Sequence, residues 1–166
     1  MELRPCNASD LQAVIELNET VYAALPDKSV LRHNSPEMIA SCLEEPNVTL
    51  GIWEGNLLIA IGMLYVPQSL EEDHFHDLGW QGHYQSANQK LFLVREGYRG
   101  QGLQSQLIRE VEKIAVARGY NLLCTTCAPN NTFSINNFLK EGYRYAKTEE
   151  KYGGLVRNLY YKVLTC

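Results

Sequence analysis

The sequence predicts an α/β fold, because three consecutive segments have the order strand, helix, strand. Residues 91–94 are four apolar residues in a row, bounded by turn chemistry, which is typical of a buried central strand. Residues 103–120 place apolar side chains at the spacing of an amphipathic helix. Residues 121–128 then predict the next strand. Because a strand, a crossover helix and a further strand usually form a right-handed parallel unit, a parallel strand pair is expected.

The segments before this unit predict one strand, two helices and a hairpin. N-cap side chains precede the first helix, and a proline stands at the first position of the second. The second hairpin strand is apolar on both faces, which predicts an inner position in the sheet. In chain order we expect a strand over residues 1–5, a helix over 10–24, a short helix from 36 that ends before 46, and hairpin strands over 48–53 and 57–65.

The segments after the unit predict one helix and two strands. Gly142 is the expected left-handed terminator of the helix, and Gly153 with Gly154 forms a turn. The expected elements are a helix over residues 133–141 and strands over 143–147 and 159–165.

The composition is that of one ordinary domain covering residues 1–166, with 45% hydrophobic and 20% charged residues. A net charge of −4 disfavours a nucleic-acid surface. No apolar run is long enough to span a membrane, and the first residues lack the apolar core of a signal peptide. We therefore expect a cytoplasmic protein without nucleic-acid or membrane partners, for which a homodimer is compatible with the sequence.

Cys124 and Cys127 form a CxxC motif that has no second cysteine pair. A zinc site needs four ligands, or three and a water molecule, and the nearest histidines are far away in the sequence. We expect both cysteines to be reduced, with one of them packed in the core, and we predict no metal site.

Residues 68–89 are the least regular stretch of the chain and contain His74, His76, Asp77 and His83. Loops of this length usually carry function or are mobile. Two interpretations remain open here: a lid over an acceptor site, and a solvated surface loop.

The glycine-rich segment 95–102 separates the central strand from its helix. A helix N-terminus exposes unpaired N–H groups, and glycines before it let an anion approach the backbone closely. Arg95 and Arg99 add positive charge on the same turn. Residues 99–104 are therefore a candidate cradle for a phosphate or pyrophosphate, although such turns also occur without a ligand.

The segment VREGYRGQGLQSQLI, residues 94–108, resembles the acetyl-CoA-binding motif of the GNAT N-acetyltransferase superfamily, with Arg99, Gly102 and Gln104 at its defining positions. Residues 130–145 resemble the second motif of the same superfamily. The matching positions there are Asn130, Ser134, Phe138, Gly142 and Tyr143. The resemblance covers roughly residues 57–164. It implies the GNAT fold: a mixed, mostly antiparallel sheet of six to seven strands with about four helices, and a splayed parallel pair at its centre.

The resemblance also implies acetyl-CoA as co-substrate and a set of residues that bind it. Phe92 and Val94 would pair with the pantetheine arm through their backbone, and the Val94 N–H would stabilise the oxyanion. Gly100 would allow the close approach of the pyrophosphate. The cofactor-binding positions carried over are Phe92, Val94, Arg99, Gly100, Gln101, Gly102, Leu103, Gln104, Ser105, Asn130 and Ser134.

Two departures from the family pattern affect the chemistry. Gln104 stands where glycine or alanine is usual, so its side chain must point away from the phosphate. Phe138 occupies the position of a tyrosine general acid and cannot donate a proton. Either another tyrosine such as Tyr152, near Arg157, acts as the acid, or solvent does; Tyr143 is expected in the core.

The function implied is acetyl transfer from acetyl-CoA to a primary amine of a small molecule or peptide, directly in a ternary complex. An alternative is a catalytically weak CoA- or acyl-CoA-binding regulatory module of the same fold. A third interpretation is an α/β protein that binds a different nucleotide. The acidic residues Glu71, Glu72, Asp73 and Asp77 hint weakly at a cationic acceptor.

Overall fold

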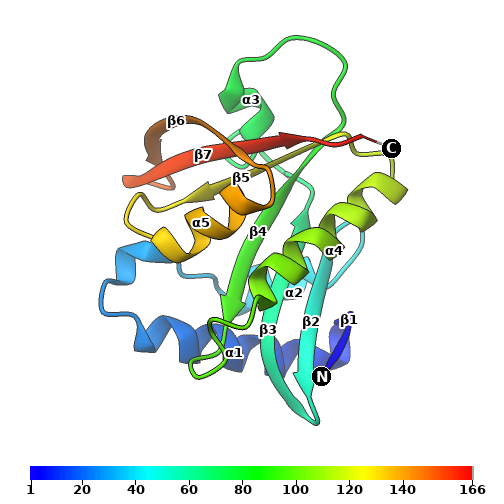
Figure 1. Cartoon of the computed structure of the whole chain (residues 1–166), viewed down its shortest axis with the longest axis vertical. Coiled ribbons are helices and arrows are strands. Elements are labelled where there is room, and N and C mark those ends of the chain that lie inside the picture. Colours follow the sequence, from blue (N-terminus) through cyan, green and yellow to red (C-terminus); the bar gives the residue numbers. More distant parts are fainter. Residues whose placement is uncertain (166) are drawn as a thin grey trace.

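The computed structural model describes residues 1–165 as one seven-stranded sheet in the order β1-β2-β3-β4-β5-β7-β6 (Figure 1). Only β4 and β5 run parallel; the other described neighbours are antiparallel. The mixed sheet and its central parallel pair confirm the predicted fold class. The strands are β1 (Glu2–Pro5), β2 (Val48–Glu54), β3 (Leu57–Tyr65), β4 (Ser86–Val94), β5 (Leu122–Cys127), β6 (Arg144–Lys151) and β7 (Leu155–Val163).

The described residues form five α-helices, and one of them, α3, was not expected from the sequence. The short helices α2 and α5 each begin after a side-chain cap, from Ser35 and Asn131 respectively. The helix that ends at residue 24 and the helix that follows the glycine turn are both present. They confirm the helices that the apolar spacing in the sequence predicts. The helices are α1 (Leu11–Ala24), α2 (Pro36–Cys42), α3 (His74–Leu78), α4 (Leu103–Ala117) and α5 (Thr132–Lys140).

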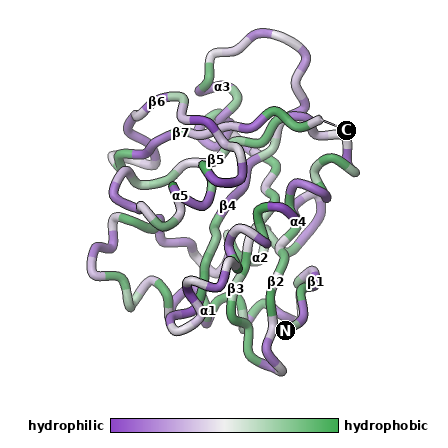
Figure 2. Tube along the Cα trace, in the orientation of Figure 1, coloured by the Kyte–Doolittle hydropathy of each residue, from purple (hydrophilic) through white to green (hydrophobic). Residues whose placement is uncertain are grey.

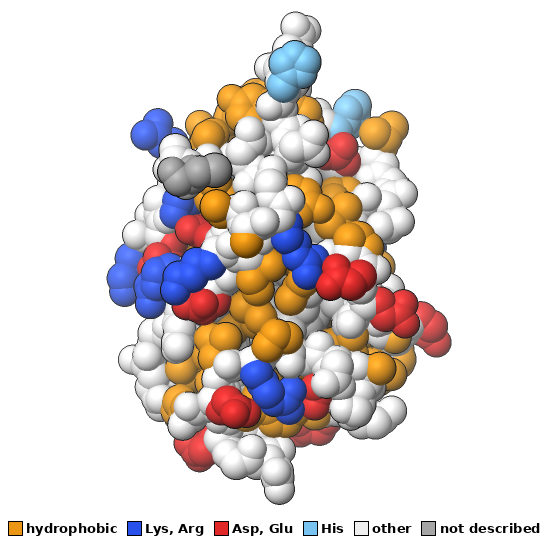
Figure 3. Space-filling model, turned by 90° about the vertical axis from the view of Figure 1, so that its right-hand side faces the viewer, with side chains coloured by type: hydrophobic (Ala, Val, Ile, Leu, Met, Phe, Trp, Pro, Cys, Tyr) orange, Lys and Arg blue, Asp and Glu red, His pale blue; other side chains and the backbone are white. Residues whose placement is uncertain are grey.

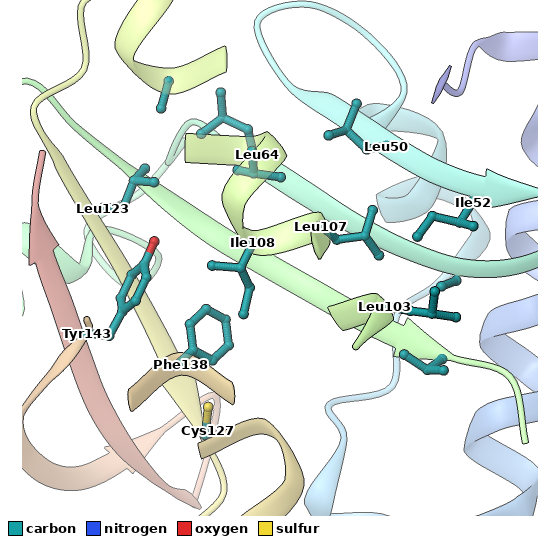
Figure 4. Packing of buried hydrophobic residues seen from close by; sticks show 14 of the residues in the cluster. Leu50, Ile52, Leu64, Leu103, Leu107, Ile108, Leu123, Cys127, Phe138 and Tyr143 are labelled. Carbon is teal, nitrogen blue, oxygen red and sulfur yellow. The ribbon is translucent and has the colours of Figure 1, made fainter. Parts of the chain in front are cut away.

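The core lies on both faces of the sheet. On one face, α4 and α5 pack against the strands, and Leu107 and Ile108 of α4 point among the strand side chains (Figure 4). On the other face, α1 and α2 bury Leu17 and Ile39 against β3. Strand β3 contributes to both clusters and is buried from Leu58 to Tyr65, which confirms its predicted inner position.

The edge strand β6 differs in polarity from the inner strands β2 and β3. Strands β2 and β3 are hydrophobic along the tube in Figure 2, whereas β6 is largely hydrophilic and mostly exposed. Figure 3 shows a face on which acidic and basic side chains are intermixed around a strip of hydrophobic ones. Across residues 1–165, no helix is long and apolar enough to cross a bilayer.

Strands β4 and β5 pair over three positions only, Ser86–Asn88 with Leu122–Cys124. Beyond them β5 continues alongside β7 and β4 alongside β3, so the parallel pair splays open. A bulge in β4 accompanies the divergence: the β3–β4 register shifts between Ile61 and Met63, and Leu91 takes a left-handed φ of 50°. The expected opening at the centre of the sheet is confirmed.

Several predicted boundaries were wrong. Strand β4 begins five residues earlier than predicted, because Asn88 and Gln89 are polar but buried by tertiary contacts. Strands β6 and β7 extend to the turn at Gly153, since backbone pairing of the edge strand β6 with β7 does not require apolar residues. Helix α4 ends at Ala117, with Gly119 in a left-handed conformation behind it. The stretch 68–89 contains helix α3, so it is less irregular than expected.

Both cysteines of the CxxC motif are buried free thiols, so each rather than one of them packs in the core. Burial raises the pKa of Cys124 and of Cys127 to about 12. Both thiols therefore stay protonated and are poor nucleophiles at neutral pH.

Candidate functional site

The glycine turn after β4 leaves the start of α4 open. Gly100 and Gly102 have left-handed φ angles of 81° and 75°, and no atom lies within 4 Å of the position that a Cβ would take at either residue. Gly102 is the N-cap of α4 and has no side chain to cap it. The first backbone bond of the helix is from Gln106 N to Gly102 O. The preceding N–H groups are therefore available to an anion at the positive end of the helix.

The two arginines of the turn have different roles. Arg95 donates to Glu16 at 2.6 Å and to the carbonyl oxygen of Leu58 at 2.9 Å, so it ties the turn to α1 and β3. The expectation that Arg95 adds charge to the cradle was wrong. Arg99 is exposed, and its guanidinium lies 5.2 Å from the ring centre of Phe133. Arg99 is the arginine that remains available beside the turn.

The side chain of Gln104 is buried against α5 and does not enter the turn. Its Nε2 donates to Ser134 Oγ at 3.1 Å, and its Oε1 accepts from Asn137 Nδ2 at 3.3 Å. Ser105 Oγ also donates to Asn137. This network holds α4 against α5, and the backbone N–H of Gln104 stays in the first turn of α4.

Three adjoining hollows form one groove from the glycine turn into the splay of the sheet. The outer hollow, about 700 Å³ of empty space, lies between α1 and Arg99. The middle hollow, about 450 Å³, shares Val94 and Arg99 with it. The inner hollow, about 680 Å³, shares Phe92 and Ser134 with the middle one and continues between β4 and β5. Because neighbouring hollows share lining residues, an extended ligand can run through all three.

The inner hollow ends at Tyr152, in the turn between β6 and β7. The Tyr152 hydroxyl lies 3.2 Å from Thr126 Oγ1 and 3.4 Å from His74 Nε2. His74 Nδ1 lies 3.2 Å from Asp77 Oδ2, to which Lys151 Nζ also donates at 2.6 Å. A continuous chain of polar contacts therefore connects Asp77 with the wall of the groove.

Burial sets the protonation states in this chain of contacts. It lowers the pKa of His74, although the neighbouring Asp77 acts in the opposite direction, so His74 is neutral at neutral pH. Burial alone would raise the pKa of Asp77, but hydrogen bonds to His74 and Lys151 outweigh it and the net pKa lies below the usual value. The ionised Asp77 favours the His74 tautomer with the proton on Nδ1. Nε2 is then a proton acceptor directed at the Tyr152 hydroxyl.

The Acetyltransferase (GNAT) family model matches residues 12–143 of the chain. The chain belongs to the GNAT acetyltransferase family. A comparison of the sequence with curated proteins finds no match.

Solved GNAT structures share the fold of this protein along its whole length. The ribosomal-protein-S18-alanine N-acetyltransferase from Escherichia coli is 16% identical with a TM-score of 0.74, over 99% of this chain and 94% of that one. A GNAT acetyltransferase from Streptococcus pneumoniae is 15% identical with a TM-score of 0.75, over 98% and 99%. A Salmonella typhimurium protein described as an acetyltransferase, with its cofactor acetyl-CoA, is 18% identical with a TM-score of 0.73, over 100% and 95%. At these identities the likeness shows the fold.

One position of the second GNAT motif, Asn130, lies differently from the expectation. Asn130 is exposed and donates to Asp27 at 3.0 Å, outside the lining of the groove. Its neighbour Asn131, which the sequence reasoning missed, lines the middle and inner hollows and caps α5 through Ser134 N. The N-cap preference of asparagine was the signal that could have identified Asn131.

Phe138 lines the inner hollow without offering a polar group. Its ring packs against Phe92 at 5.5 Å and against Tyr143 at 5.0 Å. The Tyr143 hydroxyl accepts from Gln89 Nε2 at 2.6 Å, and burial raises the pKa of Tyr143 well above its usual value. Tyr143 is therefore a core residue, as expected.

Of the four candidates His74, His76, Asp77 and His83, only His74 is among the lining residues described for the groove. His76 and His83 are exposed. Glu72 accepts from the Tyr65 hydroxyl at 2.8 Å, and Asp73 caps α3. Glu72 and Asp73 are thus engaged elsewhere in the fold, and none of the four acidic residues lines the groove in its described part, so their positions do not support the hint of a cationic acceptor.

Three cationic residues line the inner hollow of the groove: Arg32, Lys90 and Arg157. The sequence did not predict them as a group. Arg157 was noted beside Tyr152 in the sequence, whereas Arg32 and Lys90 were missed. Lys90 directly precedes the apolar run of β4. Its position beside the opening is determined only by the pleat of that strand. For metal ions, no group of three or more suitable side chains occurs within residues 1–165.

Proposed function

We propose that this GNAT protein transfers the acetyl group of acetyl-CoA to a primary amine of a small molecule or peptide, with both substrates bound together. The observation that carries the proposal is the groove. It leads from an open glycine turn, through the gap between β4 and β5, to the Tyr152 hydroxyl. A long, flexible, phosphate-bearing acyl carrier fits this combination of features better than a compact nucleotide does.

The residues present fit acetyl-CoA at three points. The turn at Gly100 and Gly102 has open space for a pyrophosphate, and Arg99 beside it supplies positive charge. Past Asn88, strand β4 has no β5 partner, so the backbone around Phe92 can pair with the amides of the pantetheine arm as a strand would. The full set proposed to hold the cofactor is Phe92, Val94, Arg99, Gly100, Gln101, Gly102, Leu103, Gln104, Ser105, Asn131 and Ser134.

Acetyl-CoA supplies a thioester whose acetyl group is already activated toward an amine. The protein must then donate a hydrogen bond to the oxygen on which negative charge develops, and we assign this to the backbone N–H of Val94. Val94 lies at the end of β4, where the outer and middle hollows meet.

The polar contacts behind Tyr152 supply the proton transfers. A proton leaving the amine passes through the Tyr152 hydroxyl to His74 Nε2, and the charge formed on His74 is balanced by Asp77. The same hydroxyl returns the proton to the sulfur of the leaving group. Tyr152 thus takes the place of the hydroxyl that Phe138 lacks.

The buried cysteine in the groove supports direct transfer. Cys127 lines the inner hollow, but its pKa of about 12 leaves almost no thiolate at neutral pH. An acyl-enzyme on Cys127 would require that thiolate as the nucleophile. Transfer in a ternary complex needs no such nucleophile, because holding the two substrates side by side provides much of the rate.

The test is thiol release from acetyl-CoA in the presence of a panel of primary amines, together with mass spectrometry of the products. An acetylated amine formed in step with free CoA supports the proposal. Binding of acetyl-CoA without turnover of any amine would instead support a regulatory CoA-binding module of the same fold.

A further inference from the structure

The inner hollow is lined by positive charge without a matching carboxylate. Arg32, Lys90 and Arg157 come from three separate segments, the loop after α1, strand β4 and strand β7, and converge on it. Its described lining contains no aspartate or glutamate. For a protein of net charge −4, this concentration of cations is a local feature of the groove.

None of the three cations lies within 4 Å of a carboxylate in the part of the chain that the structure describes. The Arg157 side chain is buried, and donates to the carbonyl oxygens of Ser29 and Val156 at 2.8 and 2.9 Å. Arg32 lies 4.1 Å over the ring of Tyr152, and Lys90 5.0 Å from the ring centre of Tyr65. Burial lowers the pKa of both Lys90 and Arg157, as expected for cations that lack an ionic partner.

The acidic residues nearest to the hollow do not neutralise it. Asp77 is bonded to Lys151 and His74, and Glu72 to the Tyr65 hydroxyl. Asp27 accepts from Asn130 and Ser29. Arg157 is buried, and Arg32 and Lys90 are half-buried beside it. Because cations withdrawn from water are normally paired, a partner that arrives with the substrate accounts for all three residues.

We propose that the acceptor amine carries an oxyanion, a carboxylate or a phosphonate, close to its amino group, as small amino acids and their analogues do. This inference rests on the acetyltransferase function proposed above. The oxyanion binds between Arg32, Lys90 and Arg157, and the amino group then lies at the Tyr152 hydroxyl. The position of Arg32 over the Tyr152 ring places the anion site and the proton-transfer group side by side.

The experiment compares acceptors that differ only in the anion. The probes are the common L-amino acids, their α-carboxamides, the amines that lack the carboxylate, and the corresponding aminophosphonic acids. We expect kcat/KM for the best acid to exceed that of its carboxamide by at least ~100-fold, because the neutral analogue leaves buried cations unpaired. The aminophosphonic acids distinguish the two anions: higher kcat/KM for them would identify a phosphonate, and lower values a carboxylate. Equal kcat/KM for acids, carboxamides and plain amines would overturn the inference and leave the acetyltransferase proposal intact.

Two substitutions locate the anion site. Arg32→Gln and Lys90→Gln should each raise KM for the acid by ~10-fold or more, with little change for the carboxamide. Lys113→Gln, an exposed cation on α4 away from the groove, is the matched control and should change neither value. An equal loss for acid and carboxamide in both groove variants would show that the residues support the fold rather than bind the anion.

A binding measurement decides the inference even if no amine is acetylated. Calorimetry with the CoA-bound protein compares an amino acid with its carboxamide. Binding of the acid that is ~10-fold tighter or more supports the anion site, and the absence of any preference overturns it. Turnover and binding therefore separate a failure of the proposed function from a failure of this inference.

Discussion

Tyr152 has a backbone conformation that its residue type rarely adopts, with φ at 52°. Non-glycine residues in the left-handed region are uncommon, and they occur preferentially where function requires a particular side-chain direction. At Tyr152 this conformation accompanies a hydroxyl that reaches Thr126 and His74 at the wall of the groove. This geometry fits the catalytic role that we propose for the Tyr152 hydroxyl.

Replacing Tyr152 by phenylalanine should therefore lower kcat by ~100-fold or more, the usual contribution of a positioned acid or base. Binding of acetyl-CoA should be unchanged, because the ring and its packing under Arg32 are kept. Steady-state rate measurements give kcat, and calorimetry gives the dissociation constant of acetyl-CoA. Tyr145→Phe removes an exposed tyrosine hydroxyl from β6 and is the control. Full activity in the Tyr152 variant would show that solvent supplies the proton.

The buried His74 predicts a dependence of stability on pH. In the folded protein burial, helped by Lys151 and opposed by Asp77, keeps the pKa of His74 below its ordinary value of about 6.5. Between that folded-state pKa and pH 6.5 the unfolded chain binds more protons than the folded one. The free energy of unfolding therefore falls as the pH is lowered through this window, by up to ~1.4 kcal/mol per pH unit.

Melting temperatures at pH 7.5 and 5.5 measure this effect. The wild type should lose more stability on acidification than His74→Gln, which has no imidazole to protonate. His76→Gln, on the same helix but exposed, should behave like the wild type. Identical pH sensitivity in all three proteins would contradict the buried, neutral state of His74.

At the scale of elements, we propose that the glycine turn and α4 together form one anion site. The left-handed φ of Gly102 tolerates asparagine better than other side chains. Gly102→Asn should therefore keep the fold and weaken CoA binding modestly, whereas Gly102→Glu puts a carboxylate beside the uncapped amides and should abolish it. Calorimetry with CoA measures both, and circular dichroism confirms folding. Normal CoA binding by a folded Gly102→Glu protein would disprove the cradle.

Gly62 of strand β3 leaves room for a groove residue because it has no side chain. A Cβ at Gly62 would lie 2.3 Å from the Phe92 ring, which lines the middle and inner hollows. Gly62→Ala should push that ring into the groove, destabilise the protein by ~1–3 kcal/mol and weaken acetyl-CoA binding. Urea unfolding and calorimetry measure the two effects.

Gly51→Ala is the matched control for this substitution. Its Cβ would meet Cys6 Sγ at 2.8 Å, in the cluster under α1 and away from the groove. We expect Gly51→Ala to cost stability without changing the affinity for acetyl-CoA in the folded protein. If both variants lose affinity equally, the effect of Gly62→Ala comes from general destabilisation.

At the scale of the whole molecule, the groove lies between two parts of the sheet that are joined by only three register pairs. A ligand that contacts α1, β4, α4 and α5 together should stabilise the folded state. At about 100 times its dissociation constant, acetyl-CoA should add ~2.7 kcal/mol and raise Tm by several degrees. CoA should act similarly and ADP less, because ADP lacks the arm that enters the splay. A rise in Tm with ADP equal to that with CoA would favour the third interpretation, in which the protein binds a different nucleotide.

Much of the fold followed from local patterns, while much of the site did not. The apolar strand β3, the amphipathic α4 and the turn at Gly142 have signals within a few residues of one another. Gln89 makes a buried hydrogen bond and Lys90 lines the groove as a cation. Both roles arise only when β4 lies beside β5. No periodicity marks such positions, because their environment comes from segments distant in the sequence.

The same reasoning explains the missed helix and the misplaced charges. Helix α3 has only five residues, too few for a helical repeat, and its Phe75 and Leu78 pack against β5 and β7. Arg95 and Arg99 are alike in sequence, but Glu16 of α1 is near only the first. Which arginine stays available depends on a residue 79 positions away.

The splay between β4 and β5 also coincides with a division of the chain. Strands β1–β4 with helices α1, α2 and α4 come from residues before 120, and β5, α5, β6 and β7 come after it. The two parts also meet where α4 packs against α5 and where the stretch around α3 packs on β5 and β7. During synthesis on the ribosome, the turn proposed to bind phosphate therefore emerges well before Tyr152 and Arg157. In the proposed function, the residues for the pyrophosphate are thus made before those for the acceptor.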